Sequence, residues 1–377
     1  MQTFTLGAKI FMGECSVAPV LTGCKNVLVV TDKFMDESGK VKYVTERLDQ
    51  IGAKYRVFSD VHPDPDTETV ASGMSVMEEA NADCIIGFGG GSAIDTAKAV
   101  RFFWETKLGK PRCRFIVIPT TSGTGSEVSA YAVITDSVKQ VKYPLVDERL
   151  LPDAAILDAS LIVSVPPKVT ADTGIDVLTH AIEAYVSIKH TDFSDAVAEK
   201  AIKLICRNLY TAYKHPNDLA ARQSVHDAAC MAGIAFSNAG LGLNHAMAHA
   251  LGAKFHVPHG RANGIVLPYV MSFNAGCSKM LTPTAKRYAE IASLLNLDTS
   301  GTRQSALSMI RDVRGLIDRL QIPTSIRAAG ISKHDFDDKL AAMVDEALAD
   351  NCMKTNPVQV YKEDMFELFR SAYNGKL

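Results

Sequence analysis

Three histidines and an Asp-His pair have the residue types and spacing of a metal site. His245, His249 and His259 lie within fifteen residues of each other, and His180 follows Asp176 by four positions. Side chains four positions apart in a helix share one face. Imidazole combined with carboxylate suits a borderline divalent ion such as iron or zinc. The pattern predicts a metal held between two helical segments, one contributing Asp176 and His180, the other His245 and His259. His256, in the same stretch, is an alternative ligand.

Two glycine-rich turns have the composition of a phosphate-binding site. Residues 89–92 (GGGS) follow an apolar run and precede a helical pattern, and residues 119–127 (PTTSGTGSE) follow another apolar run. Glycine lets a phosphate approach the backbone closely, and the start of a helix offers free N–H groups. Neither turn is a G-x-G-x-x-G or Walker loop, and two plain tight turns are the alternative. Because each follows a strand, the pair favours a dinucleotide.

Asp32 and Lys98 lie beside these turns in the sequence. Asp32 ends an apolar run, where a carboxylate can accept the 2′- and 3′-hydroxyls of an adenosine ribose and would repel a 2′-phosphate. The alternative is a helix cap within the Thr-Asp-Lys turn. Lys98 is expected to extend along its helix towards solvent.

The first half of the chain alternates strand and helix patterns. Apolar runs rich in β-branched residues predict buried strands at residues 26–30, 55–58, 84–88, 115–118 and 155–157. Amphipathic stretches between them predict helices on both faces of a parallel sheet. Ligands of such sheets bind at the carboxyl ends of the strands, where the glycines stand.

After about residue 164 the strand pattern fades, and Pro166 and Pro167 mark a junction. Helices are predicted at residues 172–187, 194–214, 218–235, 245–251, 283–294, 302–320 and 332–349. We therefore expect an α/β dinucleotide-binding domain at residues 1–164 and an all-helical metal-binding domain at residues 165–377. The active site is expected in the cleft between them.

Composition narrows the functional class. A formal net charge of −2 over 377 residues gives no electrostatic reason to expect nucleic acid or an anionic membrane as partner. The eight cysteines are scattered without a C-x-x-C pair, which favours reduced thiols in the cytoplasm. The first residues lack the pattern of a signal peptide, and no apolar run has the length of a membrane span.

Four segments together resemble the iron-containing (group III) alcohol dehydrogenases. They are GGGSAIDTAK, PTTSGTGSE, GIDVLTHAIEAY and HAMAHALGAKFHVPHG, in the order found in that family. The similarity covers essentially the whole chain, and the four motifs are highly specific as a set. Further stretches, including LADNCMKTNP, look most similar to the propanol dehydrogenase branch, which is associated with bacterial microcompartments that degrade propanediol or ethanolamine.

The resemblance implies a dehydroquinate synthase-like fold and NAD(P)-dependent interconversion of primary alcohols and aldehydes, with Fe²⁺ favoured over Zn²⁺. It implies that His249 is a non-ligand residue near the nicotinamide, either a proton carrier or a packing contact, and that Asp32 favours NAD. The implied metal ligands are Asp176, His180, His245 and His259. The implied cofactor contacts are Gly90, Gly91, Ser92, Asp95, Thr120, Thr121, Thr124, Ser129, Tyr131 and Lys142.

The same branch implies propanal and 1-propanol as substrates, a homodimer or larger oligomer, and a cytoplasmic enzyme that resides inside a microcompartment, with shell or enzyme partners there. One alternative is a zinc polyol (glycerol-type) dehydrogenase or a cyclising lyase of the same fold. Those use three protein ligands, so the fourth, His180, counts against them. A catalytically silent scaffold is a second alternative, but a scaffold has no need of four metal donors.

Overall fold

In the computed structural model, the described residues are 3–13, 17–137, 141–277, 280–297 and 300–377, without the side chains of residues 141 and 142. The chain divides at Ser164 and Val165 into two compact units. One spans Thr5–Ser164 and the other spans Val165–Leu377. Phe4 belongs with the second unit, where its ring centroid lies 5.7 Å from that of Phe193.

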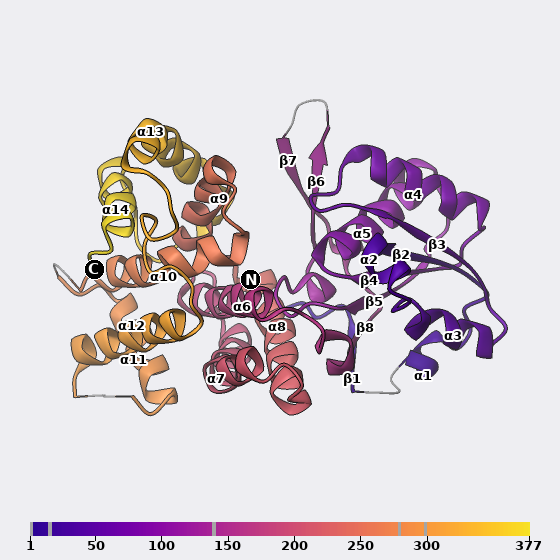
Figure 1. Ribbon diagram of the computed structural model, residues 1–377, viewed down its shortest axis with the longest axis horizontal. Coiled ribbons are helices and arrows are strands. Elements are labelled where there is room, and N and C mark those ends of the chain that lie inside the picture. The colour runs from indigo at the N-terminus through magenta and orange to yellow at the C-terminus, as the bar shows by residue number, and fades with distance from the viewer. Residues whose placement is uncertain (1–2, 14–16, 138–140, 278–279, 298–299) are drawn as a thin grey trace. The chain divides into compact units, whose positions relative to one another are not determined.

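The unit Thr5–Ser164 is built on a parallel sheet (Figure 1). Its described strands have the order β1-β8-β5-β4-β2-β3, and neighbouring strands pair in parallel. They are β1 (Lys9–Met12), β2 (Asn26–Asp32), β3 (Lys54–Val61), β4 (Cys84–Gly89), β5 (Arg114–Pro119) and β8 (Ala154–Leu157). All five predicted strands are confirmed. The sequence analysis missed β1, a short and partly exposed edge strand without a buried apolar run.

Successive side chains of β2 point to opposite faces of this sheet. Val27 and Val29 belong to a core shared with α1 (Val17–Leu21) and α3 (Lys42–Gln50). Leu28 and Val30 belong to a core shared with α4 (Thr67–Glu79) and α5 (Gly91–Lys107). The predicted α/β architecture, with helices on both faces, is therefore confirmed. Shorter elements are α2 (Lys33–Glu37), η1 (Ser126–Val128), η2 (Glu148–Leu150) and η3 (Ala159–Ile162).

An antiparallel pair of strands, not predicted, stands outside the main sheet. β6 (Tyr131–Asp136) pairs with β7 (Val141–Val146), and Tyr131 lies opposite Val146. Its apolar side chains include the exposed Tyr131 and Val133. A two-stranded pair buries too little apolar surface to produce the pattern of a core strand, which explains why the sequence analysis missed it.

The unit Val165–Leu377 is all-helical in its described residues, which confirms the predicted fold of this part. Its helices are α6 (Pro167–Val186), α7 (Asp192–Lys214), α8 (Leu219–Ala239), α9 (Leu243–Phe255), α10 (His259–Ala275), α11 (Thr284–Leu294), α12 (Thr302–Arg319), α13 (Lys333–Ala349), η4 (Asn351–Thr355) and α14 (Lys362–Asn374). The central helix α6 is buried along most of its length and packs against α7, α8 and α10. Across the described residues, no helix has both the length and the apolar character needed to span a membrane.

The sequence analysis missed α10 and α14, and the first omission affects the site. His245 and His259 lie on different helices, so the prediction that one segment carries both is wrong. His256 adopts a left-handed conformation (φ 54°) at the end of α9, and Pro258 then directs the chain into α10. Pro268 inside α10 interrupts the sequence pattern of a helix, although the helix continues through it.

Candidate functional site

Four predicted ligands from three helices converge on one point. The donor atoms of Asp176, His180, His245 and His259 all lie within 4.8 Å of one another. Oδ1 of Asp176 is 3.5 Å from Nε2 of His259, 3.7 Å from Nε2 of His245 and 3.9 Å from Nε2 of His180. Asp176 and His180 come from α6, His245 from α9 and His259 from the first turn of α10. The alternative ligand His256 is not among the clustered donors.

Burial and neighbouring groups shift the pKa values of His245 and Asp176 in this cluster. The side chains of Asp176, His180 and His245 are at most 6% exposed, whereas that of His259 is 46% exposed. Burial, together with the neighbouring His180, lowers the pKa of His245 well below its usual value. Burial opposes ionisation of Asp176, but the surrounding imidazoles lower the pKa of its carboxyl. A neutral imidazole and an ionised carboxylate are the forms that bind a divalent ion, so these donors fit iron or zinc.

Asn263, which the sequence analysis missed, lies against the same donors. Its Nδ2 donates to Oδ1 of Asp176 at 2.6 Å and lies 3.3 Å from Nε2 of His245 and 3.2 Å from Nε2 of His259. Asn244 orients the amide by donating to its Oδ1 at 2.9 Å. The donor atoms of Asp176, His245 and His259 therefore face the partial positive charge of the Asn263 amide group. A bound cation would place a positive charge against the same atoms. The only sequence signal for Asn263 is its position four residues after His259.

Glu183 is a second residue that the sequence analysis missed. Its Oε2 lies 2.5 Å from Nδ1 of His245, and its Oε1 accepts from the backbone N–H of Asn244 at 2.6 Å. A carboxylate at Nδ1 holds the ring with Nε2 facing the cluster, the usual arrangement behind a metal-binding histidine. Burial raises the pKa of Glu183 to about 7, although the N–H groups of Asn244 and Gly242 oppose this. The available signal was helical spacing, since Glu183 follows His180 by three positions.

His249, the predicted catalytic residue, lies beside these donors rather than among them. It follows His245 by one turn of α9, and its ring centroid lies 5.9 Å from that of His245. The ring is stacked on His259, with centroids 5.3 Å apart. Its Nδ1 lies 2.8 Å from Oδ2 of Asp350. The geometry separates His249 from the four clustered donors and gives it a carboxylate partner of its own.

The two glycine-rich turns of the other unit lie side by side at the carboxyl ends of β4 and β5. The backbone N–H of Thr120 donates to the carbonyl of Gly89 at 2.9 Å. A Cβ on Gly91 would lie 2.8 Å from Cγ2 of Thr124, and one on Gly90 would lie 3.6 Å from Thr121. The N-cap residue of α5 is Gly90, which has no side chain to cap the helix, so the first N–H groups of α5 suit a ligand. The predicted contacts Gly90, Gly91, Ser92, Thr120, Thr121 and Thr124 therefore surround one helix start.

Asp32 ends β2, the neighbour of β4 in the sheet. The chain leaves β2 towards β3 on one side and returns to β4 on the other, so the carboxyl ends of β2 and β4 form a topological switch point. Oδ2 of Asp32 is 3.5 Å from where a Cβ on Gly89 would lie, and its Oδ1 accepts from the N–H of Met35 at 3.0 Å. The alternative role as a helix cap is confirmed, and contact with a ribose stays a prediction.

Lys98 does not extend towards solvent, and that prediction is wrong. The side chain is 1% exposed, and its Nζ donates to the carbonyls of Ser129 and Tyr131 at 2.8 and 2.7 Å. Asp95, on the same helix, accepts from Oγ of Ser126 at 2.6 Å and from the N–H of Val133 at 3.0 Å. Both side chains hold the second glycine-rich loop and β6 against α5. The hydrogen bonds from Lys98 to the carbonyls of Ser129 and Tyr131 offset the free energy lost when its ammonium group leaves water.

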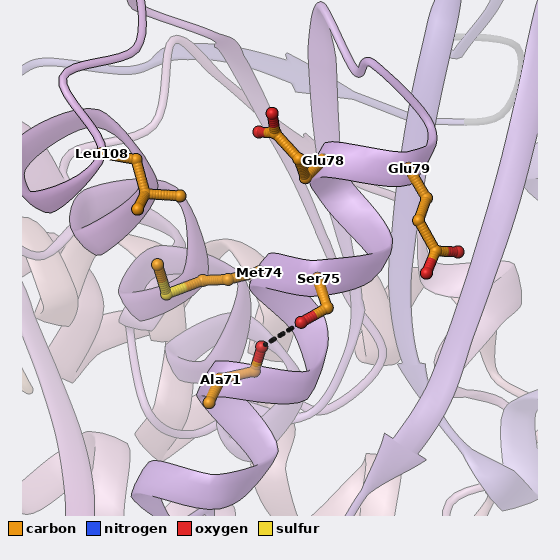
Figure 2. Close-up of a pocket in the computed structure, with 6 residues that line it drawn as sticks. All are labelled: Ala71, Met74, Ser75, Glu78, Glu79 and Leu108. Atoms are coloured by element: carbon orange, nitrogen blue, oxygen red, sulfur yellow. Dashed lines mark hydrogen bonds between the residues drawn. The ribbon is translucent and has the colours of Figure 1, made fainter.

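The remaining predicted cofactor contacts lie on or before the β6–β7 pair. Ser129 is 3% exposed, with its hydroxyl 3.2 Å from Nζ of Lys98, whereas Tyr131 is 38% exposed. Lys142 lies on β7, and its side chain is outside the described part of the chain. Figure 2 shows a pocket lined by Leu108, which follows α5, and by five residues of α4: Ala71, Met74, Ser75, Glu78 and Glu79. None of the predicted site residues lines it.

Comparison with known protein families finds matches along both units. The model of the iron-containing alcohol dehydrogenases matches residues 9–159. The C-terminal model of the Fe-containing alcohol dehydrogenase family matches residues 170–373. The two matches cover the parallel-sheet unit and the helical unit in turn.

Several curated proteins and solved structures are similar over the full length. The chain is 42% identical to 1-propanol dehydrogenase PduQ of Salmonella typhimurium, covering 98% of this chain and 99% of that protein. It is 40% identical to NADPH-dependent butanol dehydrogenase of Clostridium saccharobutylicum, covering 100% and 99%. A crystal structure of 1,3-propanediol oxidoreductase superposes with a TM-score of 0.92 at 32% identity, covering 99% and 100%. Sulfoacetaldehyde reductase from Bifidobacterium kashiwanohense in complex with NAD⁺ superposes with a TM-score of 0.89 at 27% identity, covering 99% and 98%.

Proposed function

The chain belongs to the iron-containing alcohol dehydrogenase family and is an oxidoreductase that interconverts alcohols and aldehydes; from that premise we propose 1-propanol and propanal as its preferred pair, with NAD as coenzyme. The likeness to 1-propanol dehydrogenase PduQ supports the choice of substrate. The observation that carries the proposal is the convergence of Asp176, His180, His245 and His259 within 4.8 Å. A silent scaffold has no use for this cluster, because its three buried donors cost free energy unless a cation or other partner satisfies them.

The reaction needs a Lewis acid, a bound dinucleotide and a route for one proton. Iron held by Asp176, His180, His245 and His259 would supply a Lewis acid for the oxygen of the alcohol or aldehyde. Glu183 and Asn263 fix the orientation of these side chains through His245 and Asp176. The burial of His180 and His245 excludes water from one side of the cluster, while the 46% exposed His259 marks its open side.

In the other unit, the start of α5 and the adjoining loop bind the pyrophosphate through backbone N–H groups. Asp32 accepts the ribose hydroxyls, and its negative charge disfavours the 2′-phosphate of NADP. His249 carries the proton to or from the substrate oxygen, since it is the partly exposed imidazole beside the donors. The cleft expected between the two domains stays a prediction.

The choice between NAD and NADP is a separate part of this proposal. A relative at 40% identity is named as NADPH-dependent, and a more distant one is solved with NAD⁺. The choice of NAD over NADP therefore depends on Asp32, whose carboxylate lies at the switch point beside Gly89.

The test compares His259→Ala with His256→Asn in protein purified without oxygen. We expect His259→Ala to lose bound metal and turnover of propanal but to keep its affinity for NADH, because the turns that bind the dinucleotide lie in the other unit. His256→Asn is the matched control, since Asn tolerates the left-handed conformation at this exposed position. Full turnover in a His259→Ala protein that holds no metal would contradict the proposal.

Substrate choice is tested on the wild-type protein with propanal, butanal, glycerol and 1,3-propanediol. The highest kcat/KM is expected for propanal with NADH. Glycerol as the best substrate, with zinc as the active metal, would instead support the polyol dehydrogenase.

Assembly and location are further parts of the proposal. We expect a homodimer or larger oligomer, measured by light scattering. Residence in a bacterial microcompartment is tested by whether the enzyme co-purifies with microcompartment shells. Both expectations rest on the resemblance to the propanol dehydrogenase branch.

A further inference from the structure

A histidine–carboxylate pair lies beside the metal donors and is not part of them. Nδ1 of His249, on α9, is 2.8 Å from Oδ2 of Asp350, which follows α13 directly. The two residues are 101 positions apart in the chain, so only the packing of the helical unit brings them together. The side chain of Asp350 is 19% exposed and that of His249 is 44% exposed.

A second hydrogen bond, to Oδ1, holds the carboxylate of Asp350 in place. Asp350 is the N-cap of η4, and its Oδ1 accepts from the backbone N–H of Cys352 at 2.7 Å. Burial opposes ionisation of this carboxyl, but the hydrogen bonds from His249 and Cys352 hold its pKa at about 2. The group is therefore an anchored carboxylate at neutral pH.

An anchored carboxylate determines which nitrogen of His249 carries the proton. A carboxylate can only accept hydrogen bonds, so Nδ1 must donate. In the neutral ring the lone pair then lies on Nε2, at the far side of the imidazole. The ring is also fixed in orientation, since it stacks on His259 with an angle of 21° between their planes.

We infer that Asp350 is a positioning residue that holds His249 in the Nδ1–H tautomer and so keeps Nε2 ready to exchange a proton with the substrate oxygen. The inference rests on the proposed function, in which His249 carries that proton. Asp350 itself touches neither substrate nor metal in this arrangement, so it acts through His249 alone.

Two substitutions separate this role from the capping of η4. In Asp350→Asn the single oxygen remains with the N–H of Cys352, so the amide nitrogen faces Nδ1 of His249. Nδ1 must then accept, and the proton moves to Nε2, the wrong tautomer for accepting a proton. Asp350→Ser keeps a good N-cap but is too short to serve as acceptor for His249. Asp218→Asn, at the start of α8, is the matched control for an Asp-to-Asn change at a helix cap.

The first measurement is the tautomer of His249, which does not depend on activity. Long-range ¹H–¹⁵N NMR on histidine-labelled, zinc-loaded protein distinguishes Nδ1–H from Nε2–H, and His249→Gln identifies the signal. We expect Nδ1–H in wild type and in Asp218→Asn, and Nε2–H in Asp350→Asn.

The second measurement is the rate of propanal reduction with NADH. Asp350→Asn and Asp350→Ser are each expected to lower kcat by about 10-fold or more, with the KM for propanal within about 2-fold of wild type. If Asp350 acts only through His249, the double variant His249→Gln/Asp350→Asn is no slower than His249→Gln alone. The metal content per chain should stay as in wild type.

Three results would overturn the inference, and a fourth would contradict the proposed function on which it rests. An Nε2–H tautomer in wild type would remove its basis. Full activity of Asp350→Asn together with a slow His249→Gln would show that Asp350 does not position the ring, while the proposed role of His249 would stand. Loss of one equivalent of metal in Asp350→Asn would instead make His249, Asp350 and Cys352 a metal site, since their donor atoms also lie within 4.8 Å of one another. Full activity of His249→Gln would contradict the proton-carrier role itself.

Discussion

At the scale of single residues, the helical unit concentrates polar groups where a protein interior normally has none. Asp176, His180 and His245 are buried, and Nδ1 of His180 is a buried atom without a hydrogen-bond partner among the described residues. Such groups destabilise a fold unless something compensates them. A divalent ion held by the cluster would compensate Oδ1 of Asp176 and the Nε2 atoms of His180 and His245, although Nδ1 of His180 is not one of these donor atoms.

Asp32 offers the residue-scale test of coenzyme choice. Asp32→Ser keeps an oxygen that can cap α2 through the N–H of Met35 but removes the negative charge. We expect kcat/KM for NADPH relative to NADH to rise by about 10-fold or more, because a like-charge contact with the 2′-phosphate disappears. Steady-state kinetics with both coenzymes measure the ratio. An unchanged ratio in a folded variant would mean that Asp32 serves only as a cap.

At the scale of elements, the close approach of α10 to α6 brings His259 to Asp176. A Cβ on Gly260 would lie 2.0 Å from the carbonyl oxygen of Asp172, so only glycine permits this contact. Arg261 reinforces it through an ion pair of 3.0 Å with Asp172.

Gly260→Ala should therefore push the two helices apart. We expect the free energy of unfolding to fall by about 1–3 kcal/mol, with loss of metal affinity, because backbone atoms must shift. Urea denaturation and metal titration measure the two effects. The control is Gly315→Ala, in α12, where an added Cβ meets nothing within 4 Å. That change is expected to be neutral or to stabilise slightly, and an equal loss in both variants would contradict the explanation.

The buried carboxyl of Glu127, in the unit Thr5–Ser164, predicts that the free energy of unfolding depends on pH. Burial raises the pKa of Glu127 from 4.5 to about 7, and the side chain is 3% exposed. The folded state therefore binds this proton more tightly than the unfolded chain. The contribution of protonated Glu127 to the free energy of unfolding is complete below pH 4.5 and is lost as the pH rises through about 7.

Glu127→Gln should flatten this part of the stability curve. Between pH 4.5 and 7, wild type is expected to lose on the order of 3 kcal/mol relative to the variant, because glutamine cannot ionise. Urea denaturation at several pH values in that window measures the difference. Glu46→Gln, at an exposed position, is the control. Parallel curves for wild type and Glu127→Gln would mean that Glu127 is already ionised in the folded state.

At the scale of the whole molecule, the proposed metal site and the proposed dinucleotide site lie in separate compact units, Val165–Leu377 and Thr5–Ser164. Removing metal with a chelator should increase amide exchange in α6, α9 and the start of α10. Adding NAD⁺ should protect residues 89–98 and 119–128. A ligand at 100 times its Kd stabilises its unit by about 2.7 kcal/mol, or about 100-fold in exchange that requires opening. Hydrogen-exchange mass spectrometry measures both, and a chelator effect confined to the parallel-sheet unit would contradict the assignment.

The amino-acid sequence by itself determined the local features. Alternation of apolar strands and amphipathic helices identified the parallel sheet, and the four-residue spacing of Asp176 and His180 placed both on one helix face. The glycines after β4 identified the turn at the start of α5. These are short-range properties, because side-chain direction repeats within a few residues of the same helix or strand.

The tertiary structure decided which distant groups meet. Glu183 reaches His245 from 62 positions away, and Asp350 reaches His249 from 101 positions away. Lys98 lies inside the fold because the carbonyls of Ser129 and Tyr131 accept hydrogen bonds from its ammonium group. No local pattern encodes such partners, since they depend on how whole helices and strands pack. The residues that could do the chemistry were therefore readable from the sequence, whereas the residues that orient them were not.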